Sequence, residues 1–407
     1  MGKEIRLTLM LVWPLLFGLA MIMMGSGLQG TLLSLRADVE GFSLFTTGLL
    51  MSLYYFGFLI GCMIIPKIID AVGYIRVFAA AASLGSTAIL LNGLFSQPEI
   101  WALARVVSGI SFAALYIVAE SWLNGIATNK LRGQIFGAYI FVVQGGLFAG
   151  QFLIGLAPVT DMELFVLVSV LVSFSLLPIT LASKVSLSDE PSEKLPIKIL
   201  FKSSPLSLIS VFCSGFTAAT IFTLGPLYAK DIGLSNIEVA HFIAAFILGS
   251  AILPLIIGAL SDHIDRRIAL IGIGIGSFLS GVALFILHEP QLLAVFIFGG
   301  FVTSSYSVAI AYANDHLKSS QLVSATTSLI FLNAIGACFG PLCISALMQL
   351  GAPDYFFLAL ASSFLIMTSF GVYRAFARNA NNVEKQGEFI VIPARASPGI
   401  MELQEDD

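Results

Sequence analysis

Between two long apolar runs the chain reads Gly258-Ala-Leu-Ser-Asp262-His-Ile-Asp265-Arg266-Arg267. About 190 residues earlier it reads Pro66-Lys-Ile-Ile-Asp70-Ala-Val-Gly73-Tyr-Ile-Arg76, again between two apolar runs. In both places an aspartate follows the end of an apolar segment, and an arginine follows the aspartate within a few residues. The two stretches therefore indicate that the chain contains an internal duplication.

The composition around these stretches is that of a protein dissolved in lipid. The 407 residues are 57% hydrophobic and 11% charged, whereas soluble domains are about 45–50% apolar and about 25% charged. The mean hydropathy is +0.96. This composition excludes a soluble enzyme and a disordered chain. The net charge of −4 offers no basic surface for a nucleic acid.

The apolar runs are long enough to be membrane-spanning helices, each of which needs about 20 residues. They form two sets of six, which predicts an all-α integral membrane protein with twelve transmembrane helices in two pseudo-symmetric bundles. The runs are 7–34, 43–65, 77–96, 100–125, 134–158, 163–183, 205–229, 236–260, 268–287, 291–314, 323–349 and 355–377. The predicted domains are accordingly a first bundle (1–183), a cytoplasmic linker (184–204), a second bundle (205–378) and a cytoplasmic tail (379–407).

The positions of the 20 basic residues predict the orientation of the chain. If both termini are cytoplasmic, seventeen of these residues lie in inner loops and tails and two in outer loops. Such an excess is the usual signature of the cytoplasmic side. We therefore expect a multi-pass protein of a cytoplasmic membrane with both ends inside.

Glycines repeat at the same period as the loops. Gly146 and Gly150 correspond to Gly336 and Gly340, and Gly109 corresponds to Gly300. A duplicated six-helix unit explains these pairs, and parallel repeats of this kind build a large class of secondary transporters with the substrate site between the halves. We expect the glycines to permit close helix packing.

From residue 1 to about 378 the chain resembles the Major Facilitator Superfamily. Its loop signature is matched at Gly258, Asp262, Arg266 and Arg267, although Asp265 stands where a glycine is usual. The first copy keeps Asp70, Gly73 and Arg76 but has Pro66 in place of the first glycine. A helix signature is met by Arg105 and Gly109, and the run Glu120-Ser-Trp-Leu with Arg132-Gly133 resembles the YcaD-like branch. The resemblance implies the fold, a bacterial cytoplasmic membrane and a transport function, without naming a substrate.

The charged loops suggest a mechanical role. We call Asp70, Gly73, Arg76, Gly258, Asp262, Arg266 and Arg267 the cytoplasmic latch. Each aspartate ends a helix, and nearby basic groups could tie that end to a neighbouring helix in one conformation and release it in the other. The alternative is that these residues are ordinary loop charges that set topology and cap helices.

Two charged residues fall inside a single predicted helix, Arg105 and Glu120. An ionisable group within the membrane is costly and is by default a functional candidate. Their spacing places them about 22 Å apart along the axis and about 60° apart around it, so both can face one cavity without pairing. Arg105 could instead anchor at the headgroups. For Glu120 a proton or cation site, a substrate contact and a structural hydrogen-bond partner all remain open.

Other polar residues inside the predicted spans are weaker candidates for a substrate pocket. For each, an interfacial tyrosine or an amide that bonds a neighbouring helix is the alternative, although Gln144 and Asn333 occupy corresponding positions in the two halves. The main candidates are Gln29, Tyr116, Gln144, Tyr228, Tyr306 and Asn333. Tyr54, Tyr55, Tyr139, Gln151, Tyr312 and His241 follow. One acid, one base and many aromatics suit a modest amphipathic organic molecule better than a polyanion.

The sequence thus predicts a secondary active transporter of a small organic molecule. We expect alternating access, proton coupling, export rather than uptake, and a monomer in the lipid bilayer. A transporter-like sensor or a non-transporting scaffold is the alternative. We expect no enzymatic activity, cofactor or metal site, because the four histidines and four cysteines show no ligand spacing.

Overall fold

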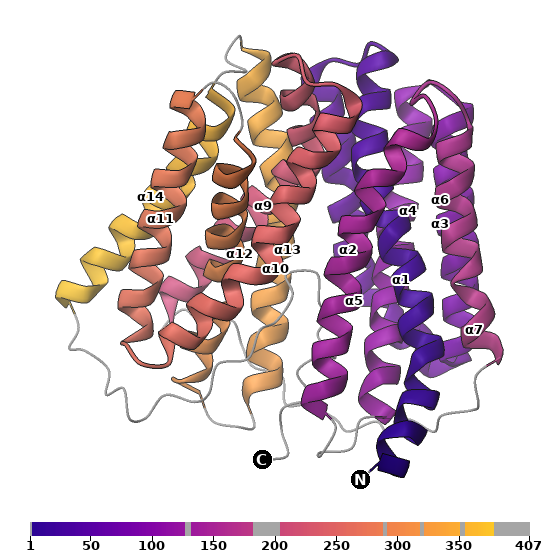
Figure 1. Ribbon diagram of the computed structural model, residues 1–407, viewed down its shortest axis with the longest axis horizontal. Coiled ribbons are helices and arrows are strands. Elements are labelled where there is room, and N and C mark those ends of the chain that lie inside the picture. The colour runs from indigo at the N-terminus through magenta and orange to yellow at the C-terminus, as the bar shows by residue number, and fades with distance from the viewer. Residues whose placement is uncertain are drawn as a thin grey trace. The chain divides into compact units, whose positions relative to one another are not determined.

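The described part of the chain is built from helices. The computed structural model describes residues 2–126, 132–181, 204–287, 291–317, 321–350 and 355–377. Within these ranges all regular secondary structure is helical, as Figure 1 shows. The predicted all-α architecture is therefore confirmed.

The first-half helices follow the first six apolar runs closely. They are α1 (Gly2–Val39), α2 (Leu44–Val72), α3 (Tyr74–Leu94), α4 (Pro98–Ile126), α5 (Arg132–Phe152) with a short 3-10 turn η1 (Leu153–Leu156), α6 (Glu163–Phe174) and α7 (Leu176–Leu181). The second-half helices are α9 (Pro205–Asp231), α10 (Asn236–Ser261), α11 (Arg266–Leu287), α12 (Leu292–Asn314), α13 (Leu322–Gln349) and α14 (Phe356–Ala377).

The sixth predicted span differs from the others because it is broken. Among the described residues, 11 helices are long and apolar enough to cross a membrane, and the sixth span is a shorter apolar segment, Glu163–Pro178. Pro178 has no N–H to donate to the carbonyl of Phe174, and α6 ends at Phe174. At the break the hydroxyl of Ser175 donates to the carbonyl of Val172 at 2.6 Å.

Local sequence explains other helix boundaries. Gly73 separates α2 from α3 and has a φ of 86°, a left-handed conformation that only glycine adopts without strain. Ser235 precedes α10, and a capping box joins Ser235 and Glu238, each side chain bonding to the backbone of the other. These residues fix where α3 and α10 begin.

The chain divides into two compact units. Among the described residues, unit 1 contains 2–42, 53–126 and 132–181, and unit 2 contains 43–52 together with all described residues from 204 onward. Residues 43–52 belong to unit 2 because they pack on α13: the backbone N–H of Phe45 donates to Oε1 of Gln349 at 3.0 Å. The predicted linker and tail lie outside the described residues, Ser204 excepted, so the predicted domain boundaries stay a prediction.

Each unit uses glycines to bring helices into backbone contact, and the contacts repeat. In unit 1, a Cβ on Gly150 of α5 would overlap the carbonyl of Met24 in α1. In unit 2, a Cβ on Gly340 of α13 would overlap the carbonyl of Phe216 in α9. The glycine pairs that the sequence suggested for close packing therefore do pack closely, in the same way in both units.

A second glycine crossing repeats in the same manner. A Cβ on Gly57 of α2 would overlap the carbonyl of Val106 in α4, and a Cβ on Gly249 of α10 would overlap that of Phe296 in α12. Because both pairs of helices touch backbone to backbone, side chains on either side of the crossing are held at fixed depth. The crossing of α2 with α4 lies next to Arg105 and therefore helps to fix the depth of this residue.

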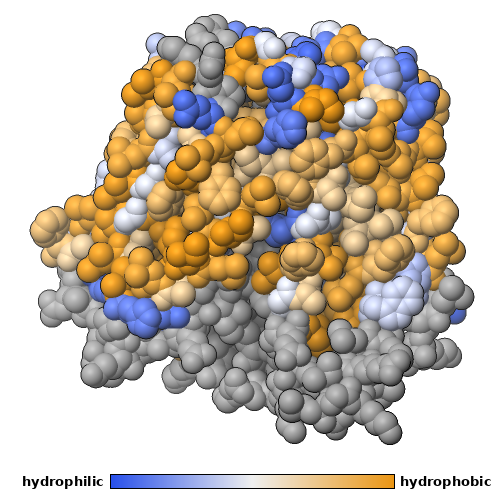
Figure 2. Space-filling view, viewed as in Figure 1, coloured by the Kyte–Doolittle hydropathy of each residue, from blue (hydrophilic) through white to orange (hydrophobic). Residues whose placement is uncertain are grey.

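Apolar side chains cover most of the described surface seen in Figure 2. Large ones are widely exposed, among them Phe141 at 78% and Leu103 at 65%. Exposed apolar surface on this scale is not stable in water and suits contact with lipid tails. The chain is a multi-pass membrane protein.

Candidate functional site

Arg105 lies on α4 inside unit 1 and is 4% exposed. Its guanidinium carbon sits 4.6 Å from the centroid of the Tyr54 ring of α2. Within the described part of the chain it forms no ion pair or hydrogen bond, and its Nε is sealed from solvent without a partner. A buried charge inside a membrane span is costly, and stacking on a ring returns only about 0.5–2 kcal/mol. The guanidinium is thus only partly compensated.

Aromatic rings continue from Tyr54 along the interface of α2 and α4. Tyr54 meets Tyr55 edge to face at 5.2 Å and Phe112 at 6.1 Å. Phe112 in turn meets Tyr116 at 6.1 Å, and Tyr116 meets Phe58 at 6.0 Å. Tyr54 and Tyr55 are half-buried, whereas the other three rings are buried. Arg105 therefore lies at one end of an aromatic column whose accessible members are Tyr54 and Tyr55.

Glu120 lies toward the other end of α4 and is 2% exposed. Its Oε1 accepts a hydrogen bond from the hydroxyl of Tyr139 on α5, a residue that is itself 4% exposed. Cys62 of α2 is close enough to interact electrostatically with the carboxylate. The structure thus joins two residues that the sequence placed separately among its candidates. The spacing of positions 120 and 139 does not predict this pairing, which depends on how α5 packs.

The remaining candidates fall into different environments. The amide of Asn333 donates to the carbonyl of Val211 in α9 at 2.8 Å, which gives it a structural bond between helices. Tyr228 stacks on Phe356 at 4.9 Å within the core of unit 2. Tyr306 is fully buried, and Gln144 is half-buried. Gln29 is buried, and its Nε2 has no hydrogen-bond partner among the residues that the structure describes. Their roles as substrate contacts stay predictions.

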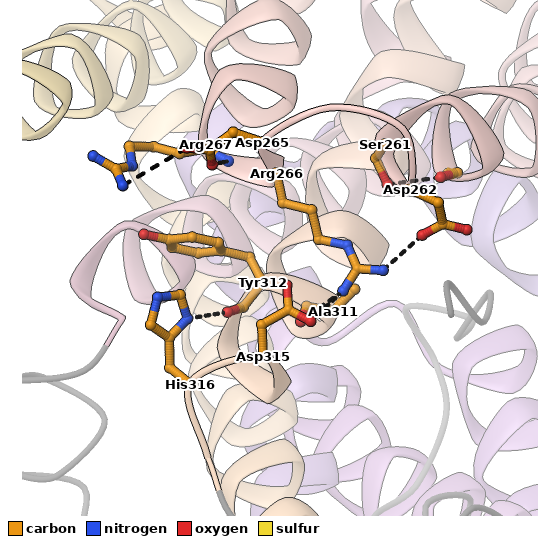
Figure 3. Close-up of polar contacts among 10 residues, drawn as sticks. Ser261, Asp262, Asp265, Arg266, Arg267, Ala311, Tyr312, Asp315 and His316 are labelled. Carbon is orange, nitrogen blue, oxygen red and sulfur yellow. Dashed lines mark hydrogen bonds and ion pairs between the residues drawn. The ribbon is translucent and has the colours of Figure 1, made fainter. Parts of the chain in front are cut away.

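In the second-half loop, Arg266 connects three helix ends. Figure 3 shows its guanidinium reaching Asp262 at the end of α10 and Asp315 just after α12. Both nitrogen–oxygen distances are 2.6 Å, and Nη1 also lies 3.3 Å from the carbonyl of Ala311. Asp315 did not feature among the sequence candidates, although its position directly after an apolar run was the available signal.

The neighbouring pair is looser. Arg267 and Asp265 are 3.8 Å apart, and the Asp265 carboxylate accepts the backbone N–H of Arg267 at 2.9 Å. Asp265, which replaces the usual glycine, thereby caps the first turn of α11. Gly258 is buried near the end of α10.

The first-half copy of the loop is open by comparison. Asp70, Gly73 and Arg76 are exposed, and Asp70 and Arg76 form no ion pair with any described residue. Asp262 and Arg266 are paired within unit 2, so the two copies are not equivalent. The latch role of all seven residues stays a prediction.

In the part of the chain that the structure describes, no three His, Cys, Asp or Glu side chains form a group suited to a metal ion. The four cysteines are free thiols. The chemistry of the described site therefore rests on one cation, one carboxyl and the rings between them.

The chain is similar in sequence to known membrane transporters. The Major Facilitator Superfamily model matches residues 15–341 and 207–399. The chain is 26% identical to the uncharacterized MFS-type transporter YcaD of Escherichia fergusonii over 86% of this chain and 92% of that protein. It is also 26% identical to YcaD of Escherichia coli O6:K15:H31 over 92% and 97%.

Solved structures agree on the fold. A bacterial homologue of the lysosomal transporter Spinster, in an inward-facing and occupied conformation, superposes with a TM-score of 0.75 at 14% identity, covering 92% of this chain and 97% of that one. The nucleoside transporter NupG gives a TM-score of 0.70 at 13% identity, covering 91% and 100%. With the repeated glycine crossings and the loop motif, these matches lead to one conclusion: the chain belongs to the Major Facilitator Superfamily of membrane transporters and resembles its YcaD-like members.

Proposed function

We propose that this chain is a proton-coupled secondary transporter that exports a small amphipathic organic molecule by alternating access. Its place is the bacterial cytoplasmic membrane, with both termini in the cytoplasm. The observation that carries the proposal is the buried carboxyl of Glu120 on α4, which accepts a hydrogen bond from the Tyr139 hydroxyl. Family membership supports transport, and the excess of basic residues in the predicted inner loops supports the orientation.

A carboxyl in this position is suited to carry a proton. Apolar surroundings favour its neutral form, whereas a hydrogen bond donated by Tyr139 favours its charged form. In the proposed cycle a proton binds to Glu120 and leaves it as the contact with Tyr139 is broken and formed again. Transport of a substrate could then be linked to the proton gradient through this one group.

The test uses purified protein in liposomes that contain a fluorescent pH indicator. A panel of amphipathic compounds is added, and any compound that moves protons across the membrane is carried forward. For that compound we expect Glu120→Gln to lose accumulation driven by a pH gradient, because glutamine mimics the protonated acid permanently. Exchange of labelled for unlabelled compound, which needs no net proton movement, should persist.

Glu163→Gln is the matched control, since Glu163 is an exposed acid in the first turn of α6. It should behave as the wild type in both assays. Gradient-driven accumulation that survives Glu120→Gln with an unchanged pH profile would remove the coupling role. If no compound moves and no proton flux appears, the sensor or scaffold alternative becomes the better reading.

A further inference from the structure

The buried arginines of the two units differ in how their charge is met. In unit 2, Arg266 lies between Asp262 and Asp315 at 2.6 Å each, and Arg267 lies 3.8 Å from Asp265. In unit 1, Arg105 is equally buried but has no carboxylate partner within the described part of the chain. Among the described residues its Nε has no hydrogen-bond partner, and the same is true of the Nε of Arg266 and of Arg267, so the missing carboxylate is what sets Arg105 apart.

The ring of Tyr54 offsets only part of this cost. A guanidinium stacked on a ring keeps its five N–H donors at the edge of its plane, where the ring does not satisfy them. Those donors form a planar fork that matches the two oxygens of a carboxylate or similar oxyanion. What Arg105 lacks is therefore an anionic group that reaches it from outside the described chain.

We propose, on the basis of the transport function proposed above, that Arg105 anchors the single anionic group of the substrate and that the substrate is a monoanion with a planar apolar body. The number of basic residues near the site supports the first part of the proposal, that the substrate carries a single negative charge. Arg105 is the only basic residue of α4, and the one on α2, Lys67, is exposed. A second negative charge on the ligand would find no partner on these helices.

The aromatic column supports the second part of the proposal, that the substrate has a planar apolar body. Tyr54 and Tyr55 are half-buried and adjoin Arg105, whereas the rings beyond them are closed in. A flat apolar body could stack on the accessible tyrosines while its oxyanion meets the guanidinium edge. Aromatic carboxylates are the simplest compounds with both features.

The first experiment uses wild-type protein in detergent, without a proton gradient. Binding of benzoate, salicylate and indole-3-acetate is measured by calorimetry and by the rise in unfolding temperature. Benzamide serves as the neutral analogue and phthalate as the dianion. We expect at least one monoanion to bind. Benzamide should bind at least about tenfold more weakly because it has no charge to pair with Arg105, and phthalate should do so because its second carboxylate has no partner.

The second experiment repeats the measurement on variants. Arg105→Gln should weaken the best monoanion by at least about tenfold, and Arg105→Lys should weaken it less, since lysine keeps the charge and loses the fork. Tyr54→Phe should bind as the wild type, whereas Tyr54→Leu should bind more weakly. The comparison of benzoate with benzamide on wild-type protein keeps the test valid if an Arg105 variant fails to fold.

Binding of none of the three monoanions, equal binding of benzoate and benzamide, or wild-type affinity in folded Arg105→Gln would each overturn the proposal. These results are separate from the proton-coupling test. Binding in detergent needs no proton gradient, so loss of coupling in Glu120→Gln leaves the anchor to be judged on the comparison of benzoate with benzamide in wild-type protein. Proton-coupled transport of uncharged compounds alone would refute the anchor and leave the coupling intact.

Discussion

The Arg266 cluster allows a prediction in which two chemically identical changes have different costs. Asp262 and Asp315 are both 2.6 Å from the same guanidinium. The Asp262 side chain is 30% exposed, whereas that of Asp315 is 8% exposed and Arg266 is 2% exposed. We compare Asp262→Asn with Asp315→Asn, substitutions that remove one charge and keep the side-chain shape.

The burial values set the expected magnitudes. Removing one partner of a fully buried pair costs about 3–5 kcal/mol. Asp315→Asn leaves Arg266 with its other aspartate, so we expect about 2–3 kcal/mol. An ion pair with a water-accessible partner contributes about 0–1 kcal/mol, which is the expected cost of Asp262→Asn. With roughly 2–4 °C per kcal/mol, the unfolding temperature should fall by about 4–12 °C for Asp315→Asn and by about 4 °C or less for Asp262→Asn.

The assay is thermal unfolding of the purified variants in one detergent, at low and at high salt. Salt should reduce the Asp262 effect, because screening acts on exposed charges, and should leave the Asp315 effect largely unchanged. The double variant shows whether the two aspartates act through the same arginine. Equal losses for the two single variants, or a larger loss for Asp262→Asn, would refute the assignment of stability to the buried pair.

The same variants address the latch hypothesis. Asp262→Asn is expected to insert into the membrane normally and to remain folded, yet to impair transport, if Asp262 controls the conformational equilibrium. Transport at the wild-type rate in this variant would leave the loop with a topological and capping role. Because the predicted stability cost is small, loss of transport could not be attributed to unfolding.

Two further predictions concern packing and pH. Gly57→Ala should lower the unfolding temperature, since its Cβ would overlap the Val106 carbonyl and such overpacking costs about 1–3 kcal/mol; Gly145→Ala, where a Cβ meets nothing within 4 Å, should be neutral, and equal effects would contradict the crossing. The Ser96 hydroxyl, and after it Arg36, lowers the pKa of Glu40 from its ordinary 4.5. Stabilisation by Glu40 is therefore present above pH 4.5 and lost as the pH falls through its folded value. Glu40→Gln should lower the unfolding temperature at pH 7 by an amount that shrinks as the pH falls below 4.5, and a pH-independent difference would disprove this.

Much of the fold was predictable because each span is a local property. Twenty or so apolar residues must form a helix in lipid whatever their neighbours do. Most predicted runs match the observed helices within about three residues, although α1 extends five residues beyond its run at each end and α2 continues seven residues past residue 65. The break at Ser175 was missed because a hydropathy run averages over Pro178, which apolar residues surround. The backbone contact of Gly150 was foreseeable from its repeat, since only small residues permit it.

The sequence predicted which residues belong to the candidate site better than it predicted which of them are in contact. Arg105 and Glu120 stood out because a charge is expensive in lipid wherever it is placed. Tyr139 as the donor to Glu120, and Asp315 as the second partner of Arg266, were not foreseen. Each of these pairings joins different helices, and no spacing along one helix encodes it.

By itself the sequence determined that the chain crosses the membrane, that it is duplicated and that α4 carries an isolated acid and an isolated base. These conclusions depend on transfer energies and helical periodicity, which act within a single segment. Only the tertiary structure decided which charges are neutralised, leaving Arg105 on a tyrosine ring and Arg266 between two carboxylates. Side chains on different helices meet only after packing fixes the rotation and depth of each helix, and that is a property of the packed bundle.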